Sequence, residues 1–251
     1  MMTPLQRLRA MLFSVQMYPM MLVIGLLYAP WAIFSKHGAR ACCKAYANWI
    51  MWTAGWMVGI RCEVRGTPPA GGALIAAKHQ SFLDILMIFA ALPTGRFIMK
   101  KEILRMPVIG QYARLLGCVA VDRAKRGGAI DKMVQDAEAS DEEAGQLIIF
   151  AQGTRVVPGV KAPYKVGAGV LYEQLNQTCV PVAVNVGLMW PRKGITRLPG
   201  VAVIEFLEPI EPGLERKEFL NLLEQRVEAG SDALMREAGF DPAPAVAKQA
   251  G

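Results

Sequence analysis

The stretch from His79 to Asp84 holds the residue types best suited to acid-base chemistry in this sequence. It follows the apolar run Ala73–Ala77, and the point where a strand gives way to a helix is the usual place for catalytic groups in α/β sheets. Ser81, followed three residues later by Asp84, is typical of a helix N-terminus, and a helix starting there lets Asp84 point back toward His79. Two interpretations are equally open: a His-Asp pair acting as a general base, or a helix cap beside an incidental loop histidine.

Basic residues follow several of the predicted strands. Lys100 comes after one apolar run, Arg123 after the next and Arg155 after a third. A single such cation is more often a solvated surface residue. Because strand ends tend to meet at one edge of a sheet, and because guanidinium groups bind phosphate with two hydrogen bonds, the repeated placement favours a shared anion site. Gly153, two residues before Arg155, permits a close approach of the backbone to a ligand.

Other catalytic schemes find no support in the sequence. No serine lies in a GxSxG elbow, and neither GxxxxGK[ST] nor a complete GxGxxG is present, so a serine hydrolase is excluded and nucleotide cofactors are unsupported. Cys118 fits a small core residue better than a thiolate nucleophile. The 5 cysteines show no CxxC or zinc-finger spacing, which argues against a disulfide framework or a zinc site and favours a reducing compartment.

Strand and helix patterns alternate along most of the chain beyond Arg61. Short apolar runs of strand length are Ala73–Ala77, Phe97–Met99, Cys118–Val121, Leu147–Phe150, Val180–Val184 and Val201–Phe206. Helical patterns are Phe82–Ala91, Gly128–Glu143, Gly167–Leu175 and Arg216–Ala238. This order predicts an α/β fold, a sheet covered by helices.

Two apolar segments precede this region and predict membrane attachment. Met11–Phe34 carries no charge and exceeds the roughly 20 residues needed to cross a bilayer, although Pro19 and Pro30 favour a kinked or re-entrant segment over a straight helix. After a basic connector, Tyr46–Ile60 presents three tryptophans on one helical face, as an interfacial helix does; a plain core helix is the alternative. Basic residues flank the first segment on both sides, which favours a hairpin with both ends in the cytoplasm.

Composition agrees with a membrane-associated protein. Of the 251 residues, 53% are hydrophobic, and the formal net charge is +7, which suits anionic lipid or phosphorylated small molecules better than nucleic acid. We expect three regions: residues 1–60 as a membrane-associated helical hairpin, 61–240 as the α/β domain, and 241–251 as a disordered tail.

Four blocks of the sequence resemble, in order and spacing, those of the bacterial 1-acyl-glycerol-3-phosphate acyltransferases, also called lysophosphatidic acid acyltransferases. The blocks are His79 to Asp84 (HxxxxD), Gly117 to Arg123, Phe150 to Arg155 and Val180 to Asn185, and Lys100 matches a lysine between the first two. The resemblance extends from about Gly71 to Pro212. It implies a central mixed sheet flanked by helices, with an N-terminal apolar hairpin.

The resemblance also implies a reaction. A fatty acyl group would pass from acyl-carrier protein or coenzyme A to the free hydroxyl of a lysophospholipid, without an acyl-enzyme, a metal or a redox cofactor. It implies that His79 takes the hydroxyl proton and that Asp84 orients His79. For the substrates it implies that Lys100, Arg123 and Arg155 hold the acceptor phosphate, that Gly153 and Thr154 shape the glycerol subsite, and that Pro181 helps form the acyl side.

One departure from the family pattern concerns the acceptor. Ala151 and Gln152 stand where the family has proline and glutamate, so the carboxylate expected beside the acceptor is missing and the amide oxygen of Gln152 takes its place. The alternatives are therefore an acyltransferase for a lyso-aminolipid such as lyso-ornithine lipid, or a non-catalytic lipid-binding protein in the membrane. In every case we expect lipid partners and no nucleic acid, at the cytoplasmic face of a bacterial inner membrane. Acyl carrier protein is a candidate partner as the acyl donor.

Overall fold

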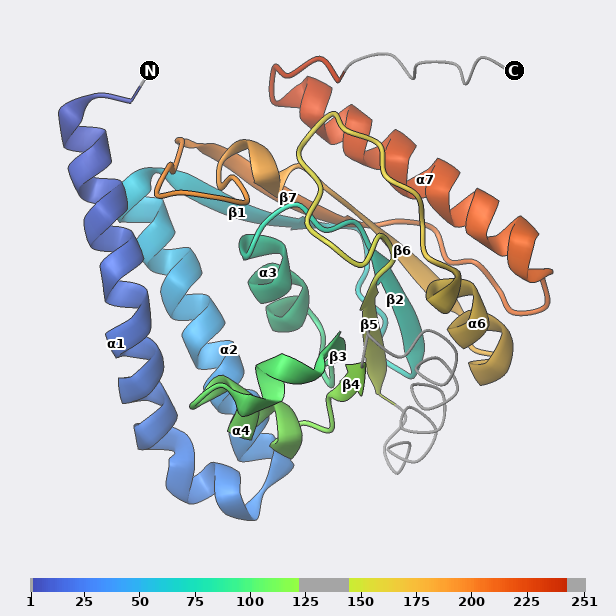
Figure 1. Cartoon of the computed structure of the whole chain (residues 1–251), viewed down its shortest axis with the longest axis horizontal. Helices are drawn as coiled ribbons and strands as arrows, with labels where there is room; N and C mark the ends of the chain where they lie inside the picture. The colour runs from blue at the N-terminus through green and yellow to red at the C-terminus, as the bar shows by residue number, and fades with distance from the viewer. Residues whose placement is uncertain (1, 122–144, 243–251) are drawn as a thin grey trace.

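The computed structural model describes residues 2–121 and 145–242. In that part of the chain a 7-stranded mixed sheet lies between two helical layers (Figure 1). The helices are α1 (Pro4–Phe34), α2 (Lys36–Thr53), α3 (Leu83–Ala91), α4 (Ile109–Leu115), α6 (Val166–Leu175) and α7 (Arg216–Glu237). The strands are β1 (Ile60–Arg65), β2 (Ala73–Ala77), β3 (Arg96–Lys100), β4 (Val119–Val121), β5 (Gln146–Phe150), β6 (Cys179–Val184) and β7 (Gly200–Phe206). Short turns of other helix types are Ala54–Val58 (π) and Lys101–Arg105 and Val186–Leu188 (3-10).

The sheet has the strand order β1-β7-β6-β2-β5-β3-β4. From β6 to β4 the neighbouring strands are parallel, whereas β7 runs antiparallel to β6 and β1 runs parallel to β7. The carboxyl ends of β6, β2, β5, β3 and β4 therefore lie at the same edge. Ligands of open α/β sheets bind at this edge, so the segments that follow these strands are the place to look for a site.

Each face of the sheet has its own hydrophobic core. Alternate residues of β2, including Ile75 and Ala77, pack under α1, α2 and α3, while Leu74 and Ala76 pack under α6 and α7. A strand buried on both faces reads as a continuous apolar run, and all of β2 is buried. That is why the sequence identifies β2 correctly at both ends.

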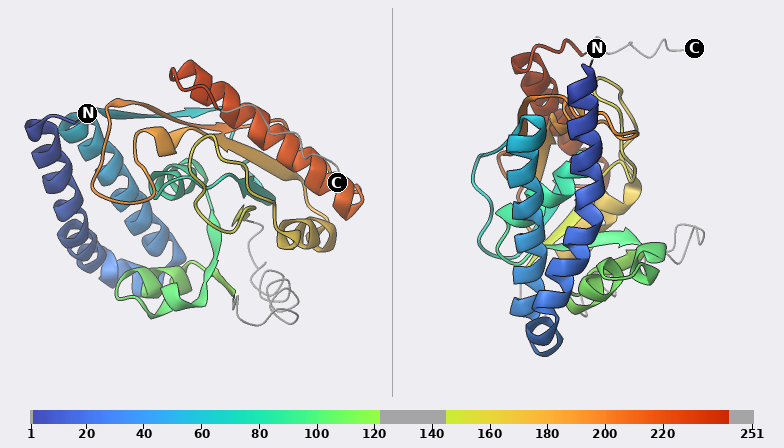
Figure 2. Two further views of the ribbon diagram at one scale, coloured as in Figure 1. Left: turned by 45° about the horizontal axis from the view of Figure 1, so that its top comes forward. Right: turned by 90° about the vertical axis from the view of Figure 1, so that its left-hand side faces the viewer.

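The N-terminal helices form an antiparallel pair that packs on the α3 side of the sheet, and Figure 2 shows them side by side. Both contribute fully buried side chains to the core, for example Phe13 from α1 and Ile50 from α2. The helix α4 also docks on α1, where the hydroxyl of Tyr112 donates to the carbonyl of Gly25 at 2.6 Å. Gly25 is required there, because a Cβ atom would lie 2.8 Å from the side chain of Val108.

The other face of α1 exposes many large apolar side chains. Leu27 is 73% and Phe34 88% exposed, and α1 is long and apolar enough to cross a membrane. Trp52 and Trp56 are also exposed, and their rings follow that of Trp49 in a row, as the spacing predicts. Such a surface is larger than a water-facing helix normally exposes and is typical of contact with a membrane.

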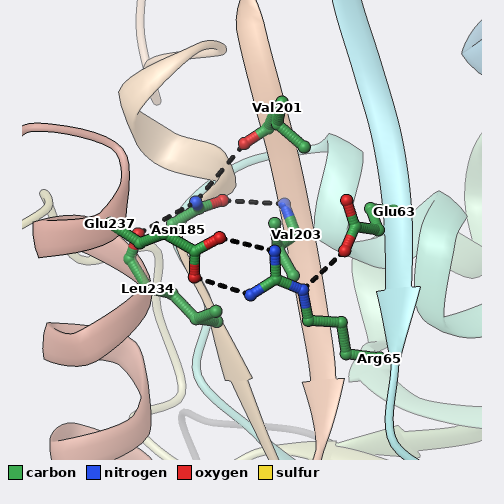
Figure 3. A network of polar contacts seen from close by, with 7 residues as sticks. All are labelled: Glu63, Arg65, Asn185, Val201, Val203, Leu234 and Glu237. Carbon is green, nitrogen blue, oxygen red and sulfur yellow. Dashed lines mark hydrogen bonds and ion pairs between the residues drawn. The ribbon is translucent and has the colours of Figure 1, made fainter.

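A polar network fastens the end of α7 to the β1 edge of the sheet (Figure 3). The guanidinium of Arg65 on β1 donates two hydrogen bonds of 2.6 Å to the carboxylate of Glu237 on α7. The side chain of Asn185 accepts from the backbone N–H of Val203 at 2.7 Å and donates to the carbonyls of Val201 and Leu234. Asn185, the last residue of the fourth sequence block, thus bridges β7 and α7.

The predicted architecture is confirmed, with differences in particular elements. All six predicted strands are present, but β1 was not predicted. The run from Met11 to Phe34 lies within a single helix that continues through both prolines, so the prolines do not break it. The basic stretch after it is not a connector, because α2 already begins at Lys36, capped by Ser35. The helix predicted at Gly128–Glu143 lies outside the described residues.

Candidate active site

His79 and Asp84 form a pair at the carboxyl end of β2. The distance between Nδ1 of His79 and Oδ1 of Asp84 is 2.8 Å. The other carboxylate oxygen of Asp84 accepts the backbone N–H groups of Gln80 and Ser81, both at 2.8 Å. Asp84 is 0% exposed, so these three donors replace the water that an ionised carboxylate would otherwise require. Asp84 therefore both caps the segment and binds His79, and the two interpretations of the sequence are not exclusive.

The local backbone explains why a residue five positions away can reach His79. The helix α3 begins at Leu83, one residue later than predicted, because Ser81 accepts the N–H of Leu83 at 3.2 Å while its own N–H goes to Asp84. The chain between β2 and α3 is thereby wrapped around the carboxylate. Gln80 holds the outside of this turn, since its side-chain oxygen accepts the N–H of Gly187 at 3.0 Å.

The imidazole of His79 is oriented for proton transfer. Its ring stacks on Phe150 at the end of β5, with 3.9 Å between centroids, and the side chain remains 12% exposed. A carboxylate at Nδ1 favours the tautomer with the proton on Nδ1, which leaves the lone pair on Nε2 to accept a proton. Geometrically, this is a general base held in one tautomer at a solvent-accessible strand end.

Of the predicted anion-binding residues, the structure places Lys100 and Arg155 at the same edge of the sheet as His79. Lys100 ends β3 and is exposed. Arg155 follows β5, and the next residue, Val156, donates its N–H to the carbonyl of His79 at 2.7 Å. The guanidinium of Arg192 donates to the carbonyl of Arg155 at 3.0 Å and adds a further positive charge there. Arg123 lies outside the described residues, so its predicted role stays a prediction.

The remaining residues of the third sequence block lie in the turn between Phe150 and Arg155 and differ in their exposure. Gly153 has a φ of 69°, a conformation that glycine adopts without strain, and Thr154 is exposed next to it. Gln152, in contrast, is 1% exposed, and its amide points toward α7, where it donates to the carboxylate of Glu228 at 3.4 Å. The structure therefore does not place the side chain of Gln152 beside His79.

Pro181 and Cys118 also lie away from the imidazole. Side chains alternate along β6, which puts Pro181 with Cys179 on the face covered by α6 and α7, opposite His79. Its predicted role at the acyl side stays a prediction. Cys118 is half-buried, and the loss of solvent around its thiol raises its pKa to about 11, as expected of an unreactive cysteine.

Sequence reasoning missed a buried ion pair directly beside His79. The ammonium of Lys78 lies 2.6 Å from the carboxylate of Glu228 on α7, and Lys78 is only 1% exposed. Successive side chains of an extended segment point to opposite faces, so Lys78 faces α7 while His79 faces α3. The one available signal was a lysine directly after a fully apolar strand, which requires a buried partner.

Comparison with known proteins identifies the family of this chain. The family profile described as Acyltransferase matches residues 60–185. A 1-acyl-sn-glycerol-3-phosphate acyltransferase of Pseudomonas aeruginosa is 27% identical over 195 residues, which cover 76% of this chain and 76% of that protein. The protein of the same name in Saccharomyces cerevisiae is 30% identical over 68% of this chain, and the match covers 57% of the yeast protein.

The fold is also that of a solved acyltransferase. The crystal structure of the 1-acyl-sn-glycerophosphate (LPA) acyltransferase PlsC from Thermotoga maritima is similar, with a TM-score of 0.75 at 22% identity, covering 91% of this chain and 97% of that one. The matched profile spans the strands and turns that carry His79, Asp84 and the Phe150–Arg155 block. The chain belongs to the acyltransferase family and is an enzyme of that class.

Proposed function

We propose that the protein transfers a fatty acyl group from an acyl thioester to the free hydroxyl of lysophosphatidic acid and so produces phosphatidic acid. The observation that carries the proposal is the contact between His79 and Asp84, which leaves Nε2 of His79 as a proton acceptor at an edge that also bears Lys100 and Arg155. The names of the relatives from Pseudomonas and yeast support lysophosphatidic acid as the acceptor.

The chemistry needs one base and no covalent enzyme intermediate. Nε2 of His79 accepts the proton of the acceptor hydroxyl while its oxygen attacks the thioester carbonyl carbon. The new C–O ester bond forms, the C–S bond breaks, and the leaving thiolate takes the proton from the imidazolium. General-base action contributes about 10²–10⁴ of the rate, so most of the remainder must come from holding the two substrates in position.

Phosphate binding follows from the charges at the same edge. Lys100 and Arg155 would hold the acceptor phosphate, with Arg123 as the third predicted contact. The exposed face of α1 supports a membrane location for the enzyme, where both the acceptor and the product reside. We place the site at the cytoplasmic face of a bacterial inner membrane, where acyl-carrier protein and acyl-coenzyme A are available as donors.

A lyso-aminolipid acceptor was suggested by the missing carboxylate at position 152. Because the side chain of Gln152 points toward Glu228 and not toward His79, the identity of residue 152 does not argue for a different acceptor. We therefore keep lysophosphatidic acid as the proposed acceptor.

An acyl-transfer assay tests the proposal. The purified protein in liposomes is incubated with labelled acyl-coenzyme A or labelled acyl-carrier protein, and with lysophosphatidic acid or lyso-ornithine lipid. The products are separated and identified by mass spectrometry. We expect phosphatidic acid, lost in His79→Ala. If only lyso-ornithine lipid gives a diacyl product, that lipid and not lysophosphatidic acid is the acceptor. If the protein binds lipid without forming any diacyl product, it is a non-catalytic lipid-binding protein.

A further inference from the structure

Three buried polar side chains and the half-buried Tyr164 meet on the α7 face of the sheet, behind the candidate active site. The carboxylate of Glu228 lies 2.6 Å from the ammonium of Lys78 through Oε2. Its Oε1 accepts the hydroxyl of Tyr164 at 3.1 Å and the amide of Gln152 at 3.4 Å. Burial and the nearby Glu228 carboxylate raise the pKa of Tyr164, so its hydroxyl keeps its proton and acts as a donor. We call these four residues the Glu228 network.

The Glu228 network ties together the two strand ends that carry the proposed chemistry. Lys78 directly precedes His79, and Gln152 lies three residues before Arg155. The two segments are already in backbone contact, since Ala151 donates its N–H to the carbonyl of Ala77 at 3.2 Å. Glu228 adds side-chain contacts to both, from a helix that belongs to the opposite side of the sheet from His79.

A gain in folding stability alone does not explain why this ion pair is buried. Lys78 is 1% and Glu228 6% exposed, and a buried ion pair often stabilises a fold no more than apolar side chains of the same size. The pair does fix an orientation, because the ammonium of Lys78 is held toward α7. Adjacent side chains point to opposite faces, so this contact sets the rotation of the chain and directs the side chain of His79 to the other face.

The same network explains why residue 152 is neutral. A glutamate at this position would place a second carboxylate within about the 3.4 Å that now separates the Gln152 amide from Glu228, with one ammonium to share between them. Like charges at this distance in a buried site repel strongly. The amide of Gln152 instead donates a hydrogen bond, and the buried charges of Lys78 and Glu228 cancel.

We propose that Glu228 is a positioning residue of the acyltransferase site, which holds His79 through Lys78 and the Arg155 turn through Gln152, and that it supplies from α7 the carboxylate that the family pattern places at position 152. This inference rests on the proposed function. It makes positions 152 and 228 one functional unit that requires a single carboxylate, at either position.

The proposal is tested by moving the carboxylate from residue 228 to residue 152 and measuring kcat and the acceptor KM. We compare Glu228→Gln, Gln152→Glu and the double variant Gln152→Glu/Glu228→Gln with wild type, using lysophosphatidic acid as acceptor and circular dichroism to confirm folding. A misplacement of about 1 Å costs about 10²-fold in rate, so each single variant should lose about 10- to 100-fold in kcat/KM, through both a lower kcat and a higher acceptor KM. The double variant should recover to within about 5-fold of wild type.

The KM separates positioning from a simple loss of folded protein. Partial unfolding lowers the apparent kcat and leaves the acceptor KM of the remaining enzyme unchanged, whereas a displaced Arg155 turn raises it. Glu224→Gln is the matched control, because it removes the same charge one turn earlier on α7, and among the described residues Lys78 pairs with Glu228 and not with Glu224. It should keep both constants within about 2-fold of wild type.

Three outcomes overturn the proposal: a folded Glu228→Gln with both constants near wild type, a loss confined to kcat, or a double variant no better than its parents. Where Glu228→Gln does not fold, Lys78→Met/Glu228→Leu removes both charges together. That variant should be folded with an impaired KM and kcat, and full activity in it would also overturn the proposal. Wild type is measured in the same assay, so a failure of wild type to make phosphatidic acid counts against the proposed function and not against the role of Glu228.

Discussion

Replacing Asp84 by asparagine is the sharpest test of the His79-Asp84 pair. The carboxylate of Asp84 accepts three N–H groups, from Nδ1 of His79 and from the backbone of Gln80 and Ser81. An asparagine has one acceptor oxygen and one NH₂ group. If the oxygen keeps the two backbone donors, the NH₂ group faces Nδ1 of His79, which must then be the acceptor. The imidazole proton moves to Nε2, and the site loses its base.

The magnitude follows from the same contacts. Loss of the base removes about 10²–10⁴ of the rate, equivalent to about 2.7–5.4 kcal/mol in the activation free energy. The two backbone hydrogen bonds survive in neutral form, so the loss of folding stability should be smaller, about 1–3 kcal/mol. We therefore expect Asp84→Asn to be folded, with a moderately lower melting temperature and a severely reduced kcat.

Initial rates at saturating substrates, together with thermal unfolding followed by circular dichroism, measure both effects. Asp241→Asn serves as the control, because Asp241 is 91% exposed and lies 3.9 Å from Arg236, a contact that contributes little at the surface. A folded Asp84→Asn that keeps kcat within about 3-fold of wild type would refute the assignment of Asp84 as the residue that sets the tautomer of His79.

Three further outcomes are expected. His79→Ala should lower kcat by about 10²–10⁴ with little effect on liposome binding, and near-full activity in a purified assay would remove the base from the mechanism. Arg155→Ala should raise the acceptor KM by about 10- to 150-fold, since a charge-assisted contact contributes about 1.5–3 kcal/mol, and Arg155→Lys should recover only part of it; an unchanged KM would move the phosphate elsewhere. Phe34→Glu should weaken liposome flotation while Val64→Glu, an equal new charge on β1, should not, and equal flotation of both would show that the membrane contact lies elsewhere.

Local patterns in the sequence predicted the elements that are buried in a regular way. The strands β2, β5 and β6 are almost wholly buried, and their continuous apolar runs locate them. The strand β1 was missed because it mixes charged and apolar residues and, at the edge of the sheet, buries few of them. The prolines of α1 do not end the helix, which packs against α2 along its length, and the predicted kink stays a prediction.

The candidate site was predictable where it depends on neighbours in sequence and unpredictable where it depends on distant ones. His79 and Asp84 lie five residues apart, so the spacing and the helix start suffice to raise their contact as one of two open interpretations. Lys78 and Glu228 are separated by 150 residues, and no pattern in either segment names the other. The side of the sheet that Gln152 faces depends on the turn after β5, which the sequence block does not specify.

The pairing of β1 with β7 joins segments that the ribosome makes far apart in time. Ile60 pairs with Gly200, so about 140 residues (200 − 60) must follow β1 before its partner exists, which takes roughly 7–28 s at about 5–20 residues per second. Throughout that interval the residues of both N-terminal helices are already synthesised, while the edge of β1 has no partner strand. Contact of the apolar face of α1 with a bilayer during synthesis would shield that face from aggregation before the sheet can be completed.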